Sequence, residues 1–383
     1  MVPRIAEKKL LELASSFMSV AVTGPHQTGK TTLVKYLFKD KPYVSFENPD
    51  FRNFALEDPR RFLQTYSNGA VLDEIQRVPD LFSYLQELLD NSSQKGLFVF
   101  SGSNNYLLQQ NISQSLAGRV AFMNLLPFSL SELNFGHYLP SSDDELMLKG
   151  FYPPIYDQNI PSTDWCANYI STYIEKDVRQ IKNIFDLHTF EKLLSLLAGR
   201  VGQELNLSSL SVELGVDIKT IKSWIGILES SFIIYLLKPH YINFNKTLIK
   251  RPKLYFHDTS LVCYLLKIYS SNQLAINAYR GSIFENMVIS ELLKHYTNLA
   301  IPSQLYYWRD KSGLEIDLIL DNGTEQIPIE IKSGQTITSE YFKNSSRFIK
   351  ISGAKRAIIL YGGKETQLRN ESIQIMPWRN FSI

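Results

Sequence analysis

Short apolar runs alternate with helical stretches along the N-terminal part of the chain. Apolar residues recur at helical spacing over 5–16 and from about 30 to 38. Four further runs have the length of buried strands and are bounded by turn residues or helical stretches, at 17–22, 43–46, 70–72 and 97–100. Strands that alternate with helices predict a mainly parallel, doubly wound sheet.

The pattern changes twice further along the chain. From residue 125 it becomes helical and irregular, and 164–237 read as mostly helical. Strand-like runs return after Pro252, at 253–256, 305–308, 316–320, 327–331 and 357–360, with a helix at about 281–296. We therefore predict an α/β multidomain chain, with an N-terminal α/β domain over 1–160, a helical middle over 161–250 and a C-terminal α/β domain over 251–383.

A glycine-rich stretch follows the first expected strand and opens a helix. Residues 24–31 read G-P-H-Q-T-G-K-T, a full match to the phosphate-binding loop G-x-x-x-x-G-K-[ST]. The glycines let backbone N–H groups wrap the phosphates, Lys30 can reach the β- and γ-phosphates, and the Thr31 hydroxyl can bind Mg²⁺. We expect ATP and Mg²⁺ to bind here, in contact with Gly24, Pro25, His26, Gln27, Thr28, Gly29, Lys30, Thr31 and Thr32.

Two acids at the end of the run 70–72 complete the expected nucleotide site. Asp73 is predicted to hold Mg²⁺ through the Thr31 hydroxyl or a water, and Glu74 to orient and deprotonate the attacking water. After the next strand, Ser103 or Asn104 is a candidate sensor of the γ-phosphate, although Ser-Gly-Ser-Asn is also ordinary turn chemistry. Arg119 is a candidate arginine finger, and the alternative is a surface salt bridge.

The order of these motifs resembles the AAA+ ATPases predicted in bacteria and archaea. It runs from the P-loop through Asp73-Glu74, S-G-S-N at 101–104 and L-A-G-R at 116–119 to L-P-F-S-L-S-E-L at 126–133. The stretches T-Y-I-E-K-D-V at 172–178 and K-L-Y-F-H-D at 253–258 resemble the same family, whose members carry a C-terminal domain of unknown function. Such proteins often have Arg where this chain has His26. The resemblance implies an ATPase, and it implies no particular substrate.

The helical middle contains a helix-turn-helix pattern. Two helical stretches, 208–216 and 219–228, are joined at Gly215, and 232–235 could enter a β-wing. This pattern resembles winged-helix domains, which bind DNA or dock on proteins. Lys219 and Lys222 on the second helix are candidate DNA contacts. A basic stretch that includes Lys246, Lys250, Arg251 and Lys253 could contact a DNA backbone.

A second group of polar residues lies in the C-terminal part. Glu285 opens a helix, Asp317 follows in an E-I-D strand, and Glu330-x-Lys332 lies on the next strand. This order resembles the PD-(D/E)xK nuclease fold, particularly its Holliday-junction-resolvase-like branch. The resemblance implies that Glu285, Asp317 and Glu330 hold Mg²⁺ and that Lys332 positions the nucleophile. Glu291 is expected to be solvated, and an E-x-K strand alone is more often a solvated pair.

The composition excludes some classes of protein but indicates no particular reaction. The net charge of +2 neither demands nor excludes nucleic acid. Two cysteines, Cys166 and Cys263, are too few for a disulfide scaffold or a four-cysteine zinc site. The chain shows no run of about 18 apolar residues and no signal peptide, so we expect a cytoplasmic protein without membrane contact.

Two functional hypotheses follow. The first is an ATP-driven enzyme that acts on DNA, with a P-loop AAA+ ATPase domain, a winged-helix-like middle and a restriction-endonuclease-like C-terminal domain that cleaves with a metal. The second is a nucleotide-controlled interaction module whose C-terminal domain only binds. AAA+ sites commonly lie between subunits, so a homo-oligomer with Arg119 supplied in trans is expected if Arg119 is the arginine finger.

Overall fold

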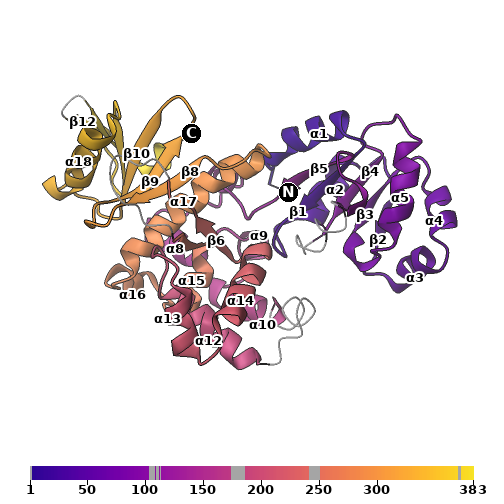
Figure 1. The fold of residues 1–383 in the computed structure, drawn as a ribbon, viewed down its shortest axis with the longest axis horizontal. Coiled ribbons are helices and arrows are strands. Elements are labelled where there is room, and N and C mark those ends of the chain that lie inside the picture. The colour runs from indigo at the N-terminus through magenta and orange to yellow at the C-terminus, as the bar shows by residue number, and fades with distance from the viewer. Residues whose placement is uncertain are drawn as a thin grey trace.

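The computed structural model describes residues 2–102, 108, 112, 114–173, 186–240, 251–369 and 372–383. Figure 1 shows an N-terminal α/β lobe on one side and the middle and C-terminal parts, packed together, on the other. Among the described residues, every helix is too short or too polar to cross a bilayer.

The N-terminal lobe is built on a five-stranded parallel sheet in the order β2-β3-β4-β1-β5. Its strands are β1 (Ser19–Thr23), β2 (Tyr43–Ser45), β3 (Ala70–Asp73), β4 (Phe98–Ser101) and β5 (Val120–Asn124). The helices are α1 (Ala6–Ser16), α2 (Lys30–Leu37), α3 (Pro49–Glu57), α4 (Pro59–Thr65) and α5 (Leu81–Asp90), with a 3-10 turn η1 (Ile75–Arg77).

Side chains alternate across this sheet, as the pleat requires. Val20 and Val22 pack with α1 and α2 on one face, whereas Ala21 and Leu72 pack with α5 on the other. Two separate apolar cores therefore cover the two faces, which confirms the doubly wound parallel sheet expected from the alternation of strands and helices. The strand β5 was not predicted, because its residues adjoin the irregular pattern that begins near 125.

The middle part is helical, as predicted. Its helices are α7 (Leu130–Phe135), α8 (Asp143–Lys149), α9 (Pro153–Asp157), α10 (Ser162–Tyr173), α12 (Leu187–Ala198), α13 (Leu207–Leu214) and α14 (Ile218–Ser230). Asn206 caps α13 and Asp217 caps α14, and Gly215 takes φ 68° between the two helices. The antiparallel strands β6 (Ile234–Leu237) and β7 (Lys253–Phe256) follow, and Glu204 forms a bridge to Lys253 on β7.

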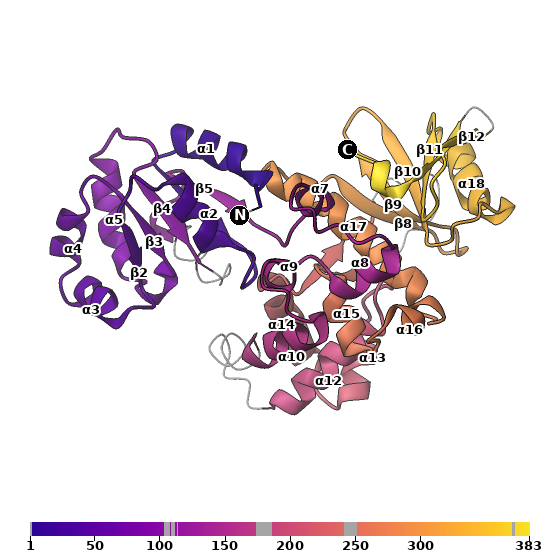
Figure 2. The same cartoon turned by 180° about the vertical axis from the view of Figure 1, so that it is seen from behind.

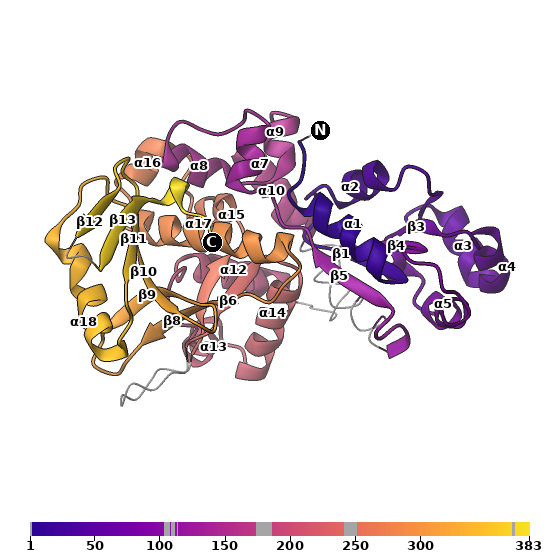
Figure 3. The same ribbon diagram turned by 90° about the horizontal axis from the view of Figure 1, so that it is seen from above.

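The C-terminal part contains a six-stranded mixed sheet in the order β12-β13-β11-β10-β9-β8. Its strands are β8 (Leu305–Arg309), β9 (Glu315–Asp321), β10 (Gln326–Lys332), β11 (Ala357–Tyr361), β12 (Gln367–Arg369) and β13 (Ile373–Pro377). The helices are α15 (Thr259–Leu265), α16 (Ser271–Ala275), α17 (Arg280–Asn298) and α18 (Lys343–Ser352), with 3-10 turns η3 (Ser339–Phe342) and η4 (Trp378–Asn380). Figure 3 shows α17 and α18 on opposite sides of this sheet.

One apolar core joins the middle and C-terminal parts. It runs from Leu126, just after β5, through α12, α14 and α17 to Trp378 near the C-terminus. The far end of α17 also contacts α1 and β5 of the N-terminal lobe, which Figures 1 and 2 show from opposite sides. The domain borders near 160 and 250 stay predictions, and the β6–β7 pairing connects the two sides of residue 250.

Candidate functional site: a nucleotide-binding loop and a C-terminal polar cluster

The phosphate-binding loop lies between β1 and α2, where the sequence predicted it. Gly24 has φ 144°, and a Cβ atom there would lie 2.2 Å from the Leu125 carbonyl oxygen. Gly29 precedes α2 with φ 88° in the left-handed region. Both positions therefore require glycine, because a side chain would clash at the first and strain the backbone at the second.

The polar groups of the motif converge on this loop. Lys30 is buried, and its Nζ donates to the carbonyls of Gly24 at 2.9 Å and Pro25 at 2.7 Å. The Thr31 hydroxyl donates to Asp73 Oδ2 at 3.0 Å, across the space between α2 and β3. This contact brings together the two residues that were predicted to share Mg²⁺.

Two residues that the sequence did not single out also hold Asp73. The Tyr43 hydroxyl donates to Asp73 Oδ2 at 2.6 Å, and the Ser101 hydroxyl donates to Oδ1. Tyr43 is at the start of β2 and Ser101 ends β4, so strands on both sides of β3 fix this carboxylate. Strand-end polar residues were the available signal for Ser101, and no local pattern indicated Tyr43.

Glu74 follows β3 in an unusual backbone conformation. Its φ of 55° and ψ of 39° are left-handed, and its N–H donates to Ser101 O at 2.8 Å. Burial raises the pKa of the Glu74 carboxyl; Asp73 adds to this shift, while Lys30, His26 and the Gln76 amide oppose it. A carboxyl with a raised pKa suits a general base.

The other predicted nucleotide residues lie in different places. Ser103 and Asn104 fall outside the described residues. Arg119 directly precedes β5, at the amino end of the sheet, whereas the P-loop lies at the carboxyl end. The five residues of β5 span roughly 16 Å, so Arg119 cannot reach the P-loop of its own chain. Within the chain it pairs with Asp90 at 2.5 Å, and the role in trans stays a prediction.

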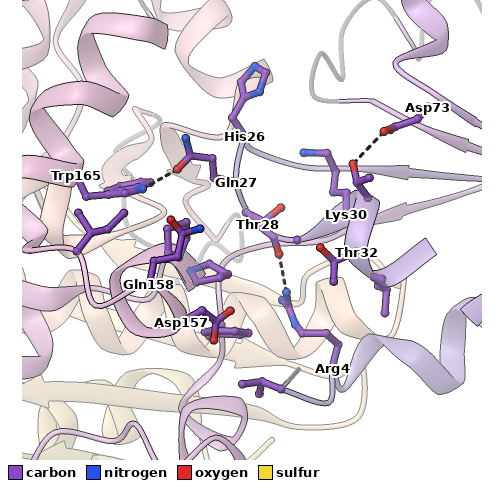
Figure 4. A pocket seen from close by; sticks show the side chains of 18 of the residues that line it. Arg4, His26, Gln27, Thr28, Lys30, Thr32, Asp73, Asp157, Gln158 and Trp165 are labelled. Carbon is purple, nitrogen blue, oxygen red and sulfur yellow. Dashed lines mark hydrogen bonds between the residues drawn. The ribbon is translucent and has the colours of Figure 1, made fainter. Parts of the chain in front are cut away.

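A cavity of about 670 Å³ lies beside the loop, between the N-terminal lobe and the helices α9 and α10. Figure 4 shows Lys30 and Asp73 on one side and Asp157, Gln158 and Trp165 on another, with Gln27 beside Trp165. The Trp165 indole N–H donates to Gln27 Oε1 at 2.7 Å. Cofactor pockets of proteins commonly have roughly 300–1,000 Å³, so the cavity has the size that a nucleotide needs.

Arg4 is a further buried residue of this site that sequence reasoning missed. Its guanidinium donates to Thr28 O at 2.7 Å in the P-loop and to Leu126 O at 2.7 Å. Its Nε donates to Glu132 Oε1 at 3.0 Å, and this fully buried carboxylate also accepts from the N–H of Ser129. The guanidinium thus connects the loop backbone to the segment that leaves β5.

That segment is held from its other side by α17. Lys294 is buried, donates to Phe128 O at 2.7 Å and lies 3.4 Å from the centre of the Phe151 ring. Glu291 accepts from the Leu130 N–H at 2.8 Å and pairs with Lys294 at 3.2 Å. The expectation that Glu291 is solvated was therefore wrong. Helix α17 contacts protein on several sides, and the pattern of apolar residues along the helix does not show this.

Among the described residues, three of the basic side chains that were expected to contact DNA are exposed. Lys219 and Lys222 are exposed on α14, and Arg251 is exposed as well, whereas Lys246 and Lys250 lie outside the described residues. Lys253 is only 2% exposed, so its assignment to a DNA-backbone contact was wrong. Its ammonium instead points into the C-terminal polar cluster.

We use the name C-terminal cluster for Lys253, Tyr255, Glu285, Glu315, Asp317, Glu330 and Lys332. Lys332 Nζ lies 3.3 Å from Asp317 Oδ2 and 2.5 Å from Glu330 Oε2. Lys253 Nζ lies 3.3 Å from Glu285 Oε1 and 2.5 Å from Glu315 Oε1, and the Tyr255 hydroxyl donates to Glu285 Oε1 at 2.5 Å. The sequence predicted four members of this cluster and missed Lys253, Tyr255 and Glu315.

The charges of this cluster perturb one another strongly. Burial, reinforced by Asp317, raises the pKa of Glu330 well above its usual value. Burial would also raise the pKa of Asp317, but Lys332, Lys253 and the Ile331 N–H hold it below its usual value. Burial lowers the pKa of Lys253, yet Glu285, Tyr255 and Asp317 outweigh it, so this ammonium stays charged.

The fit of a metal ion can be judged from the same contacts. No set of three or more His, Cys, Asp or Glu side chains in the described part of the chain is arranged as a metal cage. Glu330 Oε1, however, is buried without a hydrogen-bond partner among those residues. A divalent cation bound by one or two carboxylates and completed by water suits Asp317 and Glu330. Glu285, whose Oε1 is shared by Tyr255 and Lys253, is not arranged as a third ligand.

Cys166 and Cys263 are both free and buried. Burial raises the pKa of the Cys166 thiol to about 12. Burial also raises the pKa of the Cys263 thiol, so neither thiol is a nucleophile near neutral pH.

Comparisons with known proteins match successive segments of the chain. Three family models match successive segments: an AAA domain over 16–134, a domain of unknown function (DUF8612) over 142–272 and another (DUF4143) over 280–381. A solved Walker-type ATPase of Pyrococcus abyssi superposes with a TM-score of 0.48 at 13% identity, over 69% of this chain and 96% of that one.

Relatives extend over nearly the whole chain. An uncharacterized protein of Methanocaldococcus jannaschii is 23% identical over 403 residues, covering 94% of this chain and 87% of that protein. An uncharacterized protein of Mycobacterium tuberculosis is 30% identical over 362 residues, covering 94% of this chain and 79% of that protein. The chain thus belongs to the family of the mycobacterial protein, and its N-terminal part is a P-loop AAA domain of the ATPase type.

Proposed function

We propose that this protein binds ATP with Mg²⁺ and hydrolyses it, and that the C-terminal cluster acts on DNA in a nucleotide-dependent way. The observation that carries the ATPase proposal is the 3.0 Å contact between the Thr31 hydroxyl and Asp73, with Glu74 beside it. This arrangement of a hydroxyl, a carboxylate and a second, buried carboxylate suits Mg²⁺-assisted attack of water on a phosphoryl group.

Each residue of the loop has one task in this proposal. The N–H groups that follow Gly24 cradle the phosphates, and Lys30 exchanges the carbonyls of Gly24 and Pro25 for phosphate oxygens. Bound Mg²⁺, held by Thr31 and through Asp73, would neutralise charge on the phosphates. Glu74 takes the proton of the attacking water, because its raised pKa brings the carboxylate nearer to the basicity that this step needs.

For the C-terminal part we propose metal-dependent cleavage of a phosphodiester, with Asp317 and Glu330 holding the cation and Lys332 orienting the nucleophile. The order α17, β8, β9, β10, α18, β11 supports it, because a helix, three antiparallel-paired strands, a second helix and a parallel strand follow one another. The unpartnered Glu330 Oε1 supports a cation at this place.

DNA is the partner that the middle part favours. The order α12, the bridge at Glu204, α13, α14, β6 and β7 suits a winged-helix-like unit, and Lys219 and Lys222 lie exposed on its second helix. We propose phosphate contacts for these two lysines. A homo-oligomer with Arg119 acting in trans and a cytoplasmic site of action complete the proposal.

The second candidate is a nucleotide-controlled interaction module. It is favoured by the ion pairs that Lys253 and Lys332 make with all four carboxylates of the C-terminal cluster, because such pairing resembles a structural network. In that case ATP binding and hydrolysis persist and the cluster only binds.

One set of assays separates the candidates. ATP turnover is measured for the wild type, Lys30→Ala and Glu57→Gln, the last being a control at an exposed position away from the loop. Cleavage of linear and branched DNA with Mg²⁺ or Mn²⁺ is then compared between the wild type and Asp317→Asn. We expect Lys30→Ala to lose turnover and Asp317→Asn to lose cleavage alone. ATP turnover without DNA cleavage under any of these conditions would favour the interaction module.

A further inference from the structure

Lys253 enters the C-terminal cluster from β7, outside the strands that carry its predicted members. Its side chain is 3% exposed, and the ammonium contacts two carboxylates at once, on Glu285 and Glu315. Neither carboxylate depends on Lys253 alone. Tyr255 donates to Glu285 Oε1 at 2.5 Å, and Arg309 lies 3.2 Å from Glu315 Oε2. A buried ammonium between two carboxylates takes the kind of position that a metal cation takes between its ligands.

The part of the cluster around Lys332, Asp317 and Glu330 is more open to solvent and leaves one carboxylate oxygen without a hydrogen-bond partner among the described residues. Lys332 pairs with Asp317 and Glu330 but is 28% exposed, so it can move away toward solvent. Glu330 is 1% exposed, and its Oε1 has no hydrogen-bond partner among the described residues. An orphaned buried carboxylate oxygen is costly, and a cation beside Asp317 would satisfy it.

The charges of the cluster indicate how many divalent cations it can hold. Glu285, Glu315, Asp317 and Glu330 carry four negative charges when ionised, against the two ammonium groups of Lys253 and Lys332. Arg309 is matched by Glu204, from which it lies 3.1 Å. One divalent cation therefore neutralises the cluster. A second would create an excess of positive charge and would have to lie against the buried ammonium of Lys253.

We propose that Lys253 takes the place of a second divalent cation, so that the C-terminal cluster binds one such ion, at Asp317 and Glu330. This inference rests on the proposed metal-dependent function of the cluster and adds its stoichiometry. It also makes β7, the strand that pairs with β6, part of the C-terminal site. Glu285 and Glu315 then serve as partners of Lys253 rather than as metal ligands.

The experiment counts bound Mn²⁺ by electron paramagnetic resonance in the full chain without nucleotide. All variants carry Asp73→Asn, which removes the Walker-site carboxylate. The expected count is one Mn²⁺ per chain, falling to none with Asp317→Asn. Lys253→Met should raise the count to two by releasing Glu285 and Glu315. Lys253→Arg, which keeps the charge, and Lys343→Met, which removes an exposed lysine elsewhere, should leave it at one.

Melting curves without metal show which variants are folded. Should Lys253→Met not fold, the count for the wild-type cluster and for Glu285→Gln still tests the inference, because Glu285→Gln should keep one Mn²⁺. Two Mn²⁺ ions in the wild-type cluster, or one in folded Lys253→Met, would overturn the inference and leave metal-dependent cleavage standing. A count of zero in the wild-type cluster would overturn both.

Discussion

Replacing Glu74 by glutamine tests the hydrolytic step most directly. The two side chains have the same shape, and the N–H contact of residue 74 to Ser101 O is made by the backbone. The Gln76 amide, which donates to Glu74 Oε2 at 2.5 Å, can donate to the carbonyl oxygen of the new side chain. The folded site should therefore persist, and only the proton acceptor is lost.

The expected fall in kcat follows from the loss of this one proton acceptor. A positioned general base contributes roughly 10²- to 10⁴-fold, so kcat for ATP should fall by this factor, which is about 3–5 kcal/mol of activation free energy. The Kd for ATP should not weaken, because Lys30, Thr31 and the loop backbone are unchanged. Lys30→Ala should show the opposite pattern, since it removes the ammonium that meets the phosphates.

The pH dependence gives an independent test of the same residue. Because burial raises the pKa of Glu74, wild-type kcat should rise with pH through a value above that of an ordinary glutamate. Below that pH the carboxyl is protonated and cannot accept a proton. The assay measures phosphate release against pH for the wild type, Glu74→Gln and Glu57→Gln. If Glu74→Gln keeps kcat within threefold of the wild type, or keeps the acidic limb, Glu74 is not the base.

Three further predictions concern other parts of the molecule. Arg119→Ala should bind ATP normally but hydrolyse it poorly, and mixing it with Lys30→Ala protein should restore turnover; full activity of a monomeric protein at high dilution would refute a role in trans. ATP binding should change the tryptophan fluorescence, because Trp165 donates to Gln27 in the loop, and the change should be absent in Trp165→Phe; an equal change in that variant would contradict the assignment. Burial lowers the pKa of His257 to about 3 from 6.5, so the unfolded chain binds a proton that the folded chain does not. His257 should therefore lower the free energy of unfolding, measured by urea titration, by about 1.4 kcal/mol for each pH unit between pH 6.5 and about 3, and an unchanged slope in His257→Leu would refute this.

The positions of the P-loop residues and Asp73 could be predicted from the sequence because their determinants are local. The P-loop glycines, Lys30 and Thr31 lie within one turn between a strand and a helix, and Asp73 follows an apolar strand of the same sheet. Parallel strands end at one edge, so the positions of such residues follow from the chain order. Tyr43 and Arg4 were not predicted, since they reach the site through tertiary contacts that no local spacing encodes.

The C-terminal cluster shows where this reasoning fails. Asp317, Glu330 and Lys332 belong to one hairpin, and their proximity follows from strand pairing and period. Lys253 and Tyr255 come from a strand that pairs with the middle part, so their approach depends on how two regions pack. The helix α17 was predicted, but its contacts on both sides were not, which is why Glu291 was assigned to solvent.

The contacts of α17 argue that the two sites do not belong to independent domains. Arg4 ties the P-loop carbonyl of Thr28 to the segment that leaves β5, and Lys294 ties Phe128 of that segment to α17. The same helix carries Glu285, nine residues before Lys294, which is about 14 Å along the axis. Because every one of these links is buried and polar, breaking one would leave a donor or acceptor without a partner. Moving the loop backbone would therefore strain the links that run to α17, the helix that also carries Glu285.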